Sequence, residues 1–201
     1  AMNSIQKKVL VRMRRLGAGK VHASKDFLDL GSRAAVDQAL SRLAAQKAIN
    51  RLGQGLYYIP KLNLTLGIEV SPGMDAIAQA IARKTGSRVV PSGAVAANWL
   101  GLSTQVPAKP VYLTDGKSRN LRVGGTLFTM KHVSPRDLPL GSPTSAMVFQ
   151  ALHHMGKDSI GGDTVAHLRK RLPAEDKRKL LKDLLYVTGW IADAVRKVCN
   201  G

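Results

Sequence analysis

Hydrophobic positions near the N-terminus recur at helical spacing, with polar and basic residues between them. Aliphatic side chains stand every three or four positions in the first such segment: Ile5, Val9, Met13 and Leu16. This period predicts an amphipathic helix over residues 5–16, with Ser4 as its N-cap. Gly17 and Gly19 end the pattern, because glycine favours conformations that a helix does not use.

Two more helices are predicted before residue 48. A short one begins after Ser24, and Gly31 separates it from a longer one over residues 33–47, which Ser32 caps. The inward side of the longer helix carries aliphatic residues at helical spacing: Val36, Leu40 and Leu43. The opposite side carries small or polar residues: Ala34, Gln38, Ser41 and Ala45. The longer helix therefore has one face for a core and one face for a partner.

A predicted hairpin follows the third helix. Residues 48–52 and 56–59 are strand-like, and the Gly53-Gln54-Gly55 turn joins them, since glycine adopts the positive φ that a tight turn needs. Pro60 ends the second strand. The order helix, short helix, turn, longer helix and hairpin is that of a winged helix-turn-helix, in which the third helix enters the DNA major groove.

The remainder of the chain mixes strands and helices. Helices are predicted over residues 74–84, 92–100, 145–155, 163–171 and 174–198, and strands over 88–90, 111–114, 121–123 and 126–132. Gly189 is expected to bend or divide the last helix. We therefore expect an α+β fold with a winged helix-turn-helix over residues 1–61, a connector over 62–71, and a mixed α/β domain with a helical tail over 72–201.

The charge of the chain points to a polyanionic partner. The formal net charge is +18, from 31 Lys and Arg against 13 Asp and Glu, and the first 60 residues hold 11 of these basic residues and 3 of the acidic ones. No apolar run approaches the roughly 20 residues that span a bilayer. Cys199 is the single cysteine, so a disulfide framework is excluded and a cytoplasmic location is expected. Double-stranded DNA is the expected partner.

Candidate DNA contacts follow from the predicted third helix and hairpin. Gln38 is suited to adenine, and Arg33 and Arg42 to guanine or phosphate. The full set of predicted contacts is Lys20, Ser24, Lys25, Ser32, Arg33, Ala34, Gln38, Ser41, Arg42, Arg51 and Gln54. Helix-turn-helix folds also serve as protein–protein modules, so the sequence leaves that alternative open.

No pattern in the sequence predicts catalysis. The five histidines make no H-x-x-x-H pair, and no phosphate-binding loop motif occurs. Glu175-Asp176-Lys177 has the E-x-K spacing of some nucleases, but it lies in a charged helical stretch and its spaced acidic partner is not evident. We therefore expect no enzyme, no metal site and no cofactor. The alternative is a nuclease or nucleotide-modifying enzyme that the helix-turn-helix directs to DNA.

A longer stretch resembles a known family. Residues 91–138, "PSGAVAANWLGLSTQVPAKPVYLTDGKSRNLRVGGTLFTMKHVSPRDL", are similar to the central signature of the AbiEi family of bacterial antitoxins. The "G-x-Y-Y-x-P" ending of residues 32–61 also resembles the winged helix of that family; its residues are Gly55, Tyr57, Tyr58 and Pro60. The two matches follow one another along the chain in the order expected of that family. The tail after Pro143 matches only loosely.

The resemblance implies two roles in a type IV toxin–antitoxin system of the kind used in phage defence. The winged helix would bind inverted repeats in its own promoter and repress the operon, as a monomer or weak dimer that pairs on DNA. The C-terminal domain would counter a nucleotidyltransferase toxin without a stable complex. A mobile-element regulator that has no toxin partner is a further alternative.

The signature residues of that resemblance are expected to be mainly structural: Asn98, Leu100, Gly101, Leu102, Ser103, Gln105 and Pro107. In this interpretation Gly101 and Pro107 shape a turn, and the aliphatic residues of the stretch, Val106 included, are packed. Asn98 or Gln105 would bond to the backbone of the turn.

Overall fold

The N-terminal helix α1 spans Ser4–Leu16 in the computed structural model, which describes residues 3–201 apart from the side chain of Thr126. Its N-cap is Asn3 and not Ser4, so the predicted cap was wrong by one residue. The Asn3 side-chain oxygen accepts a hydrogen bond from the Gln6 backbone nitrogen at 2.8 Å, and the Gln6 side chain accepts one from the Asn3 backbone nitrogen at 2.8 Å. This reciprocal pair satisfies two backbone donors at once.

A tight 3₁₀ turn stands where the sequence predicted a second helix, and a strand that was not predicted precedes it. Strand β1 (Val21–Ala23) leads directly into the 3₁₀ turn η1 (Ser24–Phe27). The Asp26 carboxylate accepts a hydrogen bond from the Ala23 backbone nitrogen at 3.0 Å, which fixes the start of the turn. A three-residue strand is too short to show a period of its own, so local pattern could not reveal β1.

The predicted third helix is present as α2 (Arg33–Ala45). Ser32 is its N-cap as predicted, since its hydroxyl accepts a hydrogen bond from the Ala35 backbone nitrogen at 3.3 Å. The predicted inward side is confirmed: Val36, Leu40 and Leu43 are fully buried. They form one core with residues of α1, η1 and the following hairpin: Val9, Leu10, Met13, Phe27, Ile49 and Tyr57.

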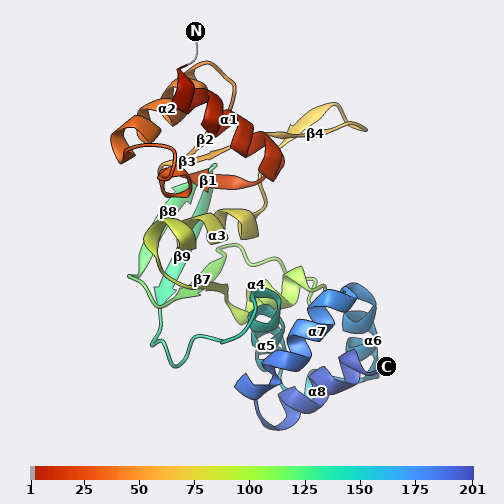
Figure 1. Ribbon diagram of the computed structural model, residues 1–201. Coiled ribbons are helices and arrows are strands. Elements are labelled where there is room, and N and C mark those ends of the chain that lie inside the picture. Colours follow the sequence, from red (N-terminus) through yellow and green to blue (C-terminus); the bar gives the residue numbers. More distant parts are fainter. Residues whose placement is uncertain (1–2) are drawn as a thin grey trace. The chain divides into compact units, whose positions relative to one another are not determined.

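The predicted hairpin consists of β2 (Asn50–Gly53) and β3 (Leu56–Tyr58). Strand β1 pairs antiparallel with β3, so the sheet order is β1-β3-β2, and α1 and α2 lie over this sheet (Figure 1). Helix, strand, helical turn, helix and hairpin make up a winged helix-turn-helix. The strand β1 completes its sheet.

The N-terminal unit continues beyond the expected boundary at residue 61. Within the expected connector, β4 (Lys61–Asn63) and β5 (Ile68–Val70) form an antiparallel hairpin, and the helix α3 (Met74–Thr85) follows. Helix α3 is bound to β1 and η1, because Arg83 donates to the Val21 carbonyl at 2.8 Å and pairs with Asp26 at 3.2 Å. One compact unit therefore comprises the chain up to Val89, together with Asn120–Leu127.

The second compact unit comprises Val90–Arg119 and Phe128–Gly201. It contains most of β6 (Val89–Pro91), all of α4 (Gly93–Trp99) and β7 (Val111–Thr114), and the larger part of β9 (Thr126–His132). Strand β8 (Arg119–Val123), which forms a hairpin with β9, belongs to the first unit except for Arg119. The strand order is β6-β7-β9-β8, and β7 pairs in parallel with β9. The tip of the β8–β9 hairpin belongs to the first unit, where the Gly124 backbone nitrogen donates to the Leu52 carbonyl at 3.0 Å.

A cluster of helices forms the rest of this second unit. They are α5 (Pro143–Met155), η2 (Lys157–Ser159), α6 (Gly162–Arg171), α7 (Ala174–Lys182), η3 (Asp183–Tyr186) and α8 (Gly189–Cys199). The predicted division at Gly189 is confirmed, since α8 begins there. Buried aliphatic and aromatic residues hold the cluster together, among them Val148, Phe149, Leu152, Leu168, Leu180 and Val195. Over residues 3–201, no helix is long and apolar enough to cross a bilayer.

Candidate nucleic-acid interface

The side of α2 that faces away from the core is exposed and carries short or polar side chains. The exposed residues on that side and its edges are Ala34, Gln38, Ser41, Arg42 and Ala45. This agrees with the predicted orientation of the helix. Small side chains allow a helix to approach base edges closely, and the Gln38 amide can both donate to and accept from an adenine.

A concave surface of about 440 Å³ lies beside this face, between η1, α2 and the β2–β3 hairpin. Four predicted contacts line it together: Lys25, Arg33, Ser41 and Arg51. Ser24 lines it too, but is only 5% exposed. Five lining residues were not predicted: Ala23, Asp37, Gly55, Tyr57 and Lys84. Four cations against one carboxylate make this surface a favourable place for phosphate oxygens.

Asp37 is the acidic residue of the concave surface, and it is doubly engaged. It accepts a hydrogen bond from the Ser24 hydroxyl and pairs with Arg33, whose Nε lies 3.0 Å from Oδ2. The pKa of Asp37 lies below its usual range. The hydrogen bond from Ser24 contributes most to this lowering, and the hydrogen bond and positive charge of Arg33 add to it. The Ser24 hydroxyl, which was predicted among the DNA contacts, therefore donates its hydrogen within the protein.

Lys84 lies in the last turn of α3, and its ammonium group donates to the Gln54 carbonyl at the tip of the hairpin. Arg51 lies over the Tyr57 ring, with 5.9 Å from its guanidinium carbon to the ring centroid. These contacts hold the hairpin and its cations in place. Lys84 was not predicted as part of this surface, because the helix that carries it was expected in the second domain.

The other predicted contacts lie outside the concave surface. Ala34, Gln38 and Arg42 are on the outward side of α2, and Gln54 is at the tip of the hairpin with φ of 54°. Lys20 is exposed in the segment before β1, and Ser32 is exposed at the α2 N-terminus, where it acts as the cap. The structure thus groups the cations beside α2 and leaves the base-reading candidates on its open face.

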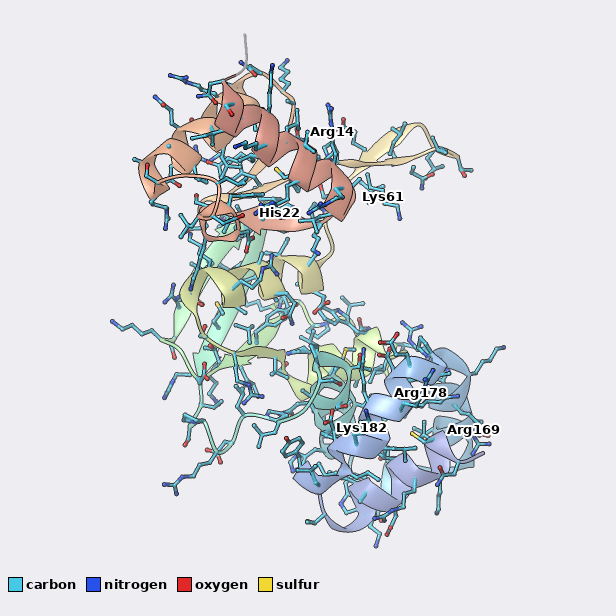
Figure 2. All side chains as sticks on the ribbon, viewed as in Figure 1. Arg14, His22, Lys61, Arg169, Arg178 and Lys182 are labelled. Carbon is cyan, nitrogen blue, oxygen red and sulfur yellow. The ribbon has the colours of Figure 1, made fainter. Side chains whose placement is uncertain are left out.

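His22 lies on β1, next to the turn η1 (Figure 2). It is 2% exposed, its ring centroid lies 5.5 Å from that of Phe27, and its Nε2 has no hydrogen-bond partner among the described residues. Burial lowers the pKa of His22 to about 4, because the charged imidazole would lose its hydration. The residue is therefore neutral at pH 7 and adds no charge to the interface.

The "LGLSTQVP" stretch in the second unit forms a turn held by side chains. Asn98 Nδ2 donates to the Ser103 carbonyl at 3.2 Å, and His167 Nε2 lies 2.8 Å from the Leu100 carbonyl oxygen. Gly101 has φ of 73°, which favours glycine. These contacts agree with the expected structural role of Asn98 and Gly101.

The rest of the stretch is less uniform. Leu100 is buried and Leu102 is half-buried, as expected, but Val106 is 78% exposed, so its predicted packing was wrong. The Gln105 side chain is exposed, and its backbone nitrogen donates to the Ser103 hydroxyl at 3.2 Å. Pro107 is half-buried where the chain leaves the turn. An alternating apolar pattern overestimates burial where the chain crosses a surface.

No group of three or more His, Cys, Asp or Glu side chains that could hold a metal ion occurs in residues 3–201. Among curated proteins, none matches this chain. One family profile matches residues 8–180, from α1 of the winged helix to α7 of the second unit, and thus reaches both units. The chain belongs to that family, DUF6088, a family of unknown function.

Proposed function

We propose that this protein is a DNA-binding transcriptional autorepressor. The observation that carries the proposal is the pair of adjoining surfaces on the winged helix. One is the open face of α2 with Gln38, and the other is the cationic concave surface with Lys25, Arg51 and Lys84. A major groove about 12 Å wide admits one helix, and the phosphates that flank it meet whatever lies beside that helix.

The division between these surfaces corresponds to two kinds of contact. The small side chains of the α2 face permit close approach, so that Gln38 and Arg42 reach base edges. The cations of η1 and the hairpin then bind the phosphate backbone, which fixes the position of the helix without reading sequence. Arg33, at the N-terminal end of α2, stands between the two groups and is suited to guanine or phosphate.

The second half of the proposal concerns the C-terminal unit and rests on its resemblance to AbiEi antitoxins. The "LGLSTQVP" turn is the part of the chain most similar to that family. On this basis the C-terminal unit counters a nucleotidyltransferase toxin, without a stable complex between the two proteins. The protein binds inverted repeats of its own promoter as a monomer or weak dimer that pairs on DNA, with half-sites about 34 Å apart.

The test of DNA binding uses the purified full-length chain and a labelled duplex from the region upstream of its own gene. Fluorescence anisotropy at fixed salt compares this duplex with a shuffled one of the same composition. We expect the native duplex to bind at least 100-fold more tightly, and Gln38→Ala to lose part of that preference. Equal binding of both duplexes would contradict the role of a sequence-specific repressor.

The test of antitoxicity uses the neighbouring gene. If it encodes a nucleotidyltransferase, that protein is expressed from an unrelated promoter, with and without the full-length chain. We expect the chain to restore growth, and the double variant Gln38→Ala, Lys25→Ala to restore it equally while no longer repressing its promoter. Rescue that requires those two residues would mean that antitoxicity acts through DNA and that the two roles are not separable.

A further inference from the structure

A cavity of about 590 Å³ lies within the C-terminal unit, between the helices α6 and α8 and beside η2. This volume is within the range of small-molecule sites, which is about 300–1,000 Å³. The cavity lies entirely among residues 157–197, so the winged helix contributes nothing to it. Neither the DNA-binding proposal nor the resemblance to antitoxins gives it a role.

The walls of this cavity carry an excess of positive charge. Three cations line it: Lys157, Arg169 and Lys197. Within residues 3–201, the side-chain ion pairs include none of these three cations. The C-terminal residue Gly201 lies against the Arg169 guanidinium. The acidic lining residue, Asp193, is paired instead with Arg196, at 2.9 Å from Nη1 to Oδ1. An anion is the ligand that this charge favours.

Arg169, which Figure 2 labels, lines the cavity from α6. Its Nη2 donates to the Lys197 carbonyl at 2.5 Å, so the guanidinium is tied to α8. This bond holds the positive charge of Arg169 at the side of the cavity that α6 and α8 share.

The N-terminus of α6 opens on the same cavity. Its N-cap is Gly161, which has no side chain to accept from the first backbone N–H groups of the helix. A Cβ at Gly161 or Gly162 would meet nothing within 4 Å, so a ligand has room to approach the backbone there. The N–H groups and the helix dipole add to the attraction that the three cations exert on an anion.

Apolar residues, among them an aromatic ring, also line the cavity. Trp190, Ile160 and Val165 do so and are themselves half-buried against the helical core. Indole rings stack on nucleic-acid bases and similar planar rings. A ligand with an anionic group and a flat ring can therefore contact both kinds of lining residue.

We propose that the cavity between α6 and α8 binds a nucleotide. Its phosphates lie among Lys157, Arg169 and Lys197, and its base lies against Trp190. The site is independent of DNA binding by the winged helix, and it adds a small-molecule ligand to the C-terminal unit.

The experiment is isothermal titration calorimetry on the full-length chain, with ATP, GTP, CTP and UTP in turn. Two further titrations use inorganic pyrophosphate, which has the phosphates of the ligand without the base, and adenosine, which has the base without the phosphates. We expect at least one nucleotide to bind at one site per chain, and pyrophosphate to bind at least tenfold more weakly than that nucleotide. Failure of all four nucleotides to bind at millimolar concentration would overturn the proposal, as would equal affinities for pyrophosphate and nucleotides.

Variants locate the site. Lys157→Ala and Arg169→Lys are each expected to weaken nucleotide binding at least tenfold. Trp190→Leu should weaken the nucleotide at least fivefold and leave pyrophosphate unchanged. The matched control is Lys170→Ala, which removes one charge from the exposed side of the same helix α6 and should change affinity less than twofold.

Equal losses of nucleotide affinity in Lys170→Ala and Lys157→Ala would show that only the net charge of the protein attracts the nucleotide. The proposed site would then be wrong. A loss in Arg51→Ala would place the ligand on the winged helix instead. Displacement of the nucleotide by a short single-stranded oligonucleotide, with the same loss in Lys157→Ala, would mean that this surface binds nucleic acid rather than a free nucleotide.

Discussion

Arg33 Nε lies 3.0 Å from Oδ2 of Asp37, one turn further along α2. Both side chains are about half exposed, and both line the concave surface beside the proposed DNA-reading face. The pair joins an expected DNA contact to the carboxylate of the concave surface. If the surface binds DNA as proposed, phosphate and Asp37 compete for the same guanidinium.

Replacing Asp37 by Asn should strengthen DNA binding, because it removes a negative charge from the interface and releases Arg33. The expected gain is about threefold to tenfold for any duplex at low salt. Fluorescence anisotropy measures it. The matched control is Asp29→Asn, which makes the same change of charge at a carboxylate paired with Arg12 of α1. Equal gains from both variants would mean that net charge alone decides affinity.

Gln38→Ala should reduce the preference for the native duplex, since Gln38 is on the open face of α2. The expected loss is about 1–3 kcal/mol of discrimination, and Arg33→Ala is expected to behave similarly. Lys25→Ala and Arg51→Ala should instead weaken binding of all sequences about equally, because the proposed partners of these two cations are phosphates. If Gln38→Ala leaves the preference intact and Lys25→Ala abolishes it, the assigned roles of these two surfaces are reversed.

The affinity for DNA should fall steeply with salt. If the cationic surface and its neighbours neutralise about five to seven phosphates, log K falls against log salt with a slope of about −0.9 for each of them. A titration from 50 to 300 mM salt measures the slope. Lys25→Ala should make it shallower by about one phosphate, whereas the exposed Lys170→Ala on α6 should leave it unchanged. A slope near zero in the unaltered protein would rule out phosphate neutralisation.

The stability of the protein should decline as the pH falls from about 6.5 toward 4. The buried His22 has a pKa of about 4 in the folded protein, against about 6.5 when unfolded, so the unfolded chain binds the proton more readily in this window. The contribution is present above pH 6.5 and decreases by about 3 kcal/mol by pH 4. Urea unfolding at several pH values measures it.

The variant His22→Phe should remove this part of the pH dependence. The exposed His153→Gln on α5 is the control and should retain it. A pH profile that is the same in His22→Phe as in the unaltered protein would show that other groups govern acid unfolding.

Gly101→Ala should destabilise the turn of the "LGLSTQVP" stretch for two reasons. Its φ of 73° is strained for alanine, and an added Cβ would lie 2.9 Å from His167 Nε2, which is held against the Leu100 carbonyl. We expect a loss of about 1–3 kcal/mol in the free energy of unfolding. Gly156→Ala, at φ of 80° with open space around it, isolates the backbone term. An equal loss in both variants would mean that contact with His167 costs nothing.

Much of the winged helix could be predicted from local pattern. The burial of Val36, Leu40 and Leu43 and the exposure of Gln38 follow from one helical period, because burial of an aliphatic stripe fixes the rotation of the whole helix. The Ser32 cap and the glycines of the hairpin turn also act through their nearest neighbours in the chain. Such features need no knowledge of the rest of the fold.

Pairings between distant segments could not be predicted in this way. Strand β1 is a strand because β3, more than thirty residues later, supplies its hydrogen bonds. Lys84 reaches the hairpin because Arg83 binds α3 to β1 and η1. The Ser24 hydroxyl does not point its hydrogen outward, because it donates that hydrogen to Asp37 of α2. Each of these depends on a partner that sequence spacing does not identify.

The sequence by itself determined the α+β class, the winged helix order, the cationic character and the orientation of α2, since composition and hydrophobic period act locally. Only the tertiary structure decided where the N-terminal unit ends, which cations gather beside α2, and that α6 and α8 enclose a charged cavity. Those features arise where side chains from separate elements meet. The energies of these contacts depend on the distance between side chains in space, and that distance cannot be read from the positions of the residues along the chain.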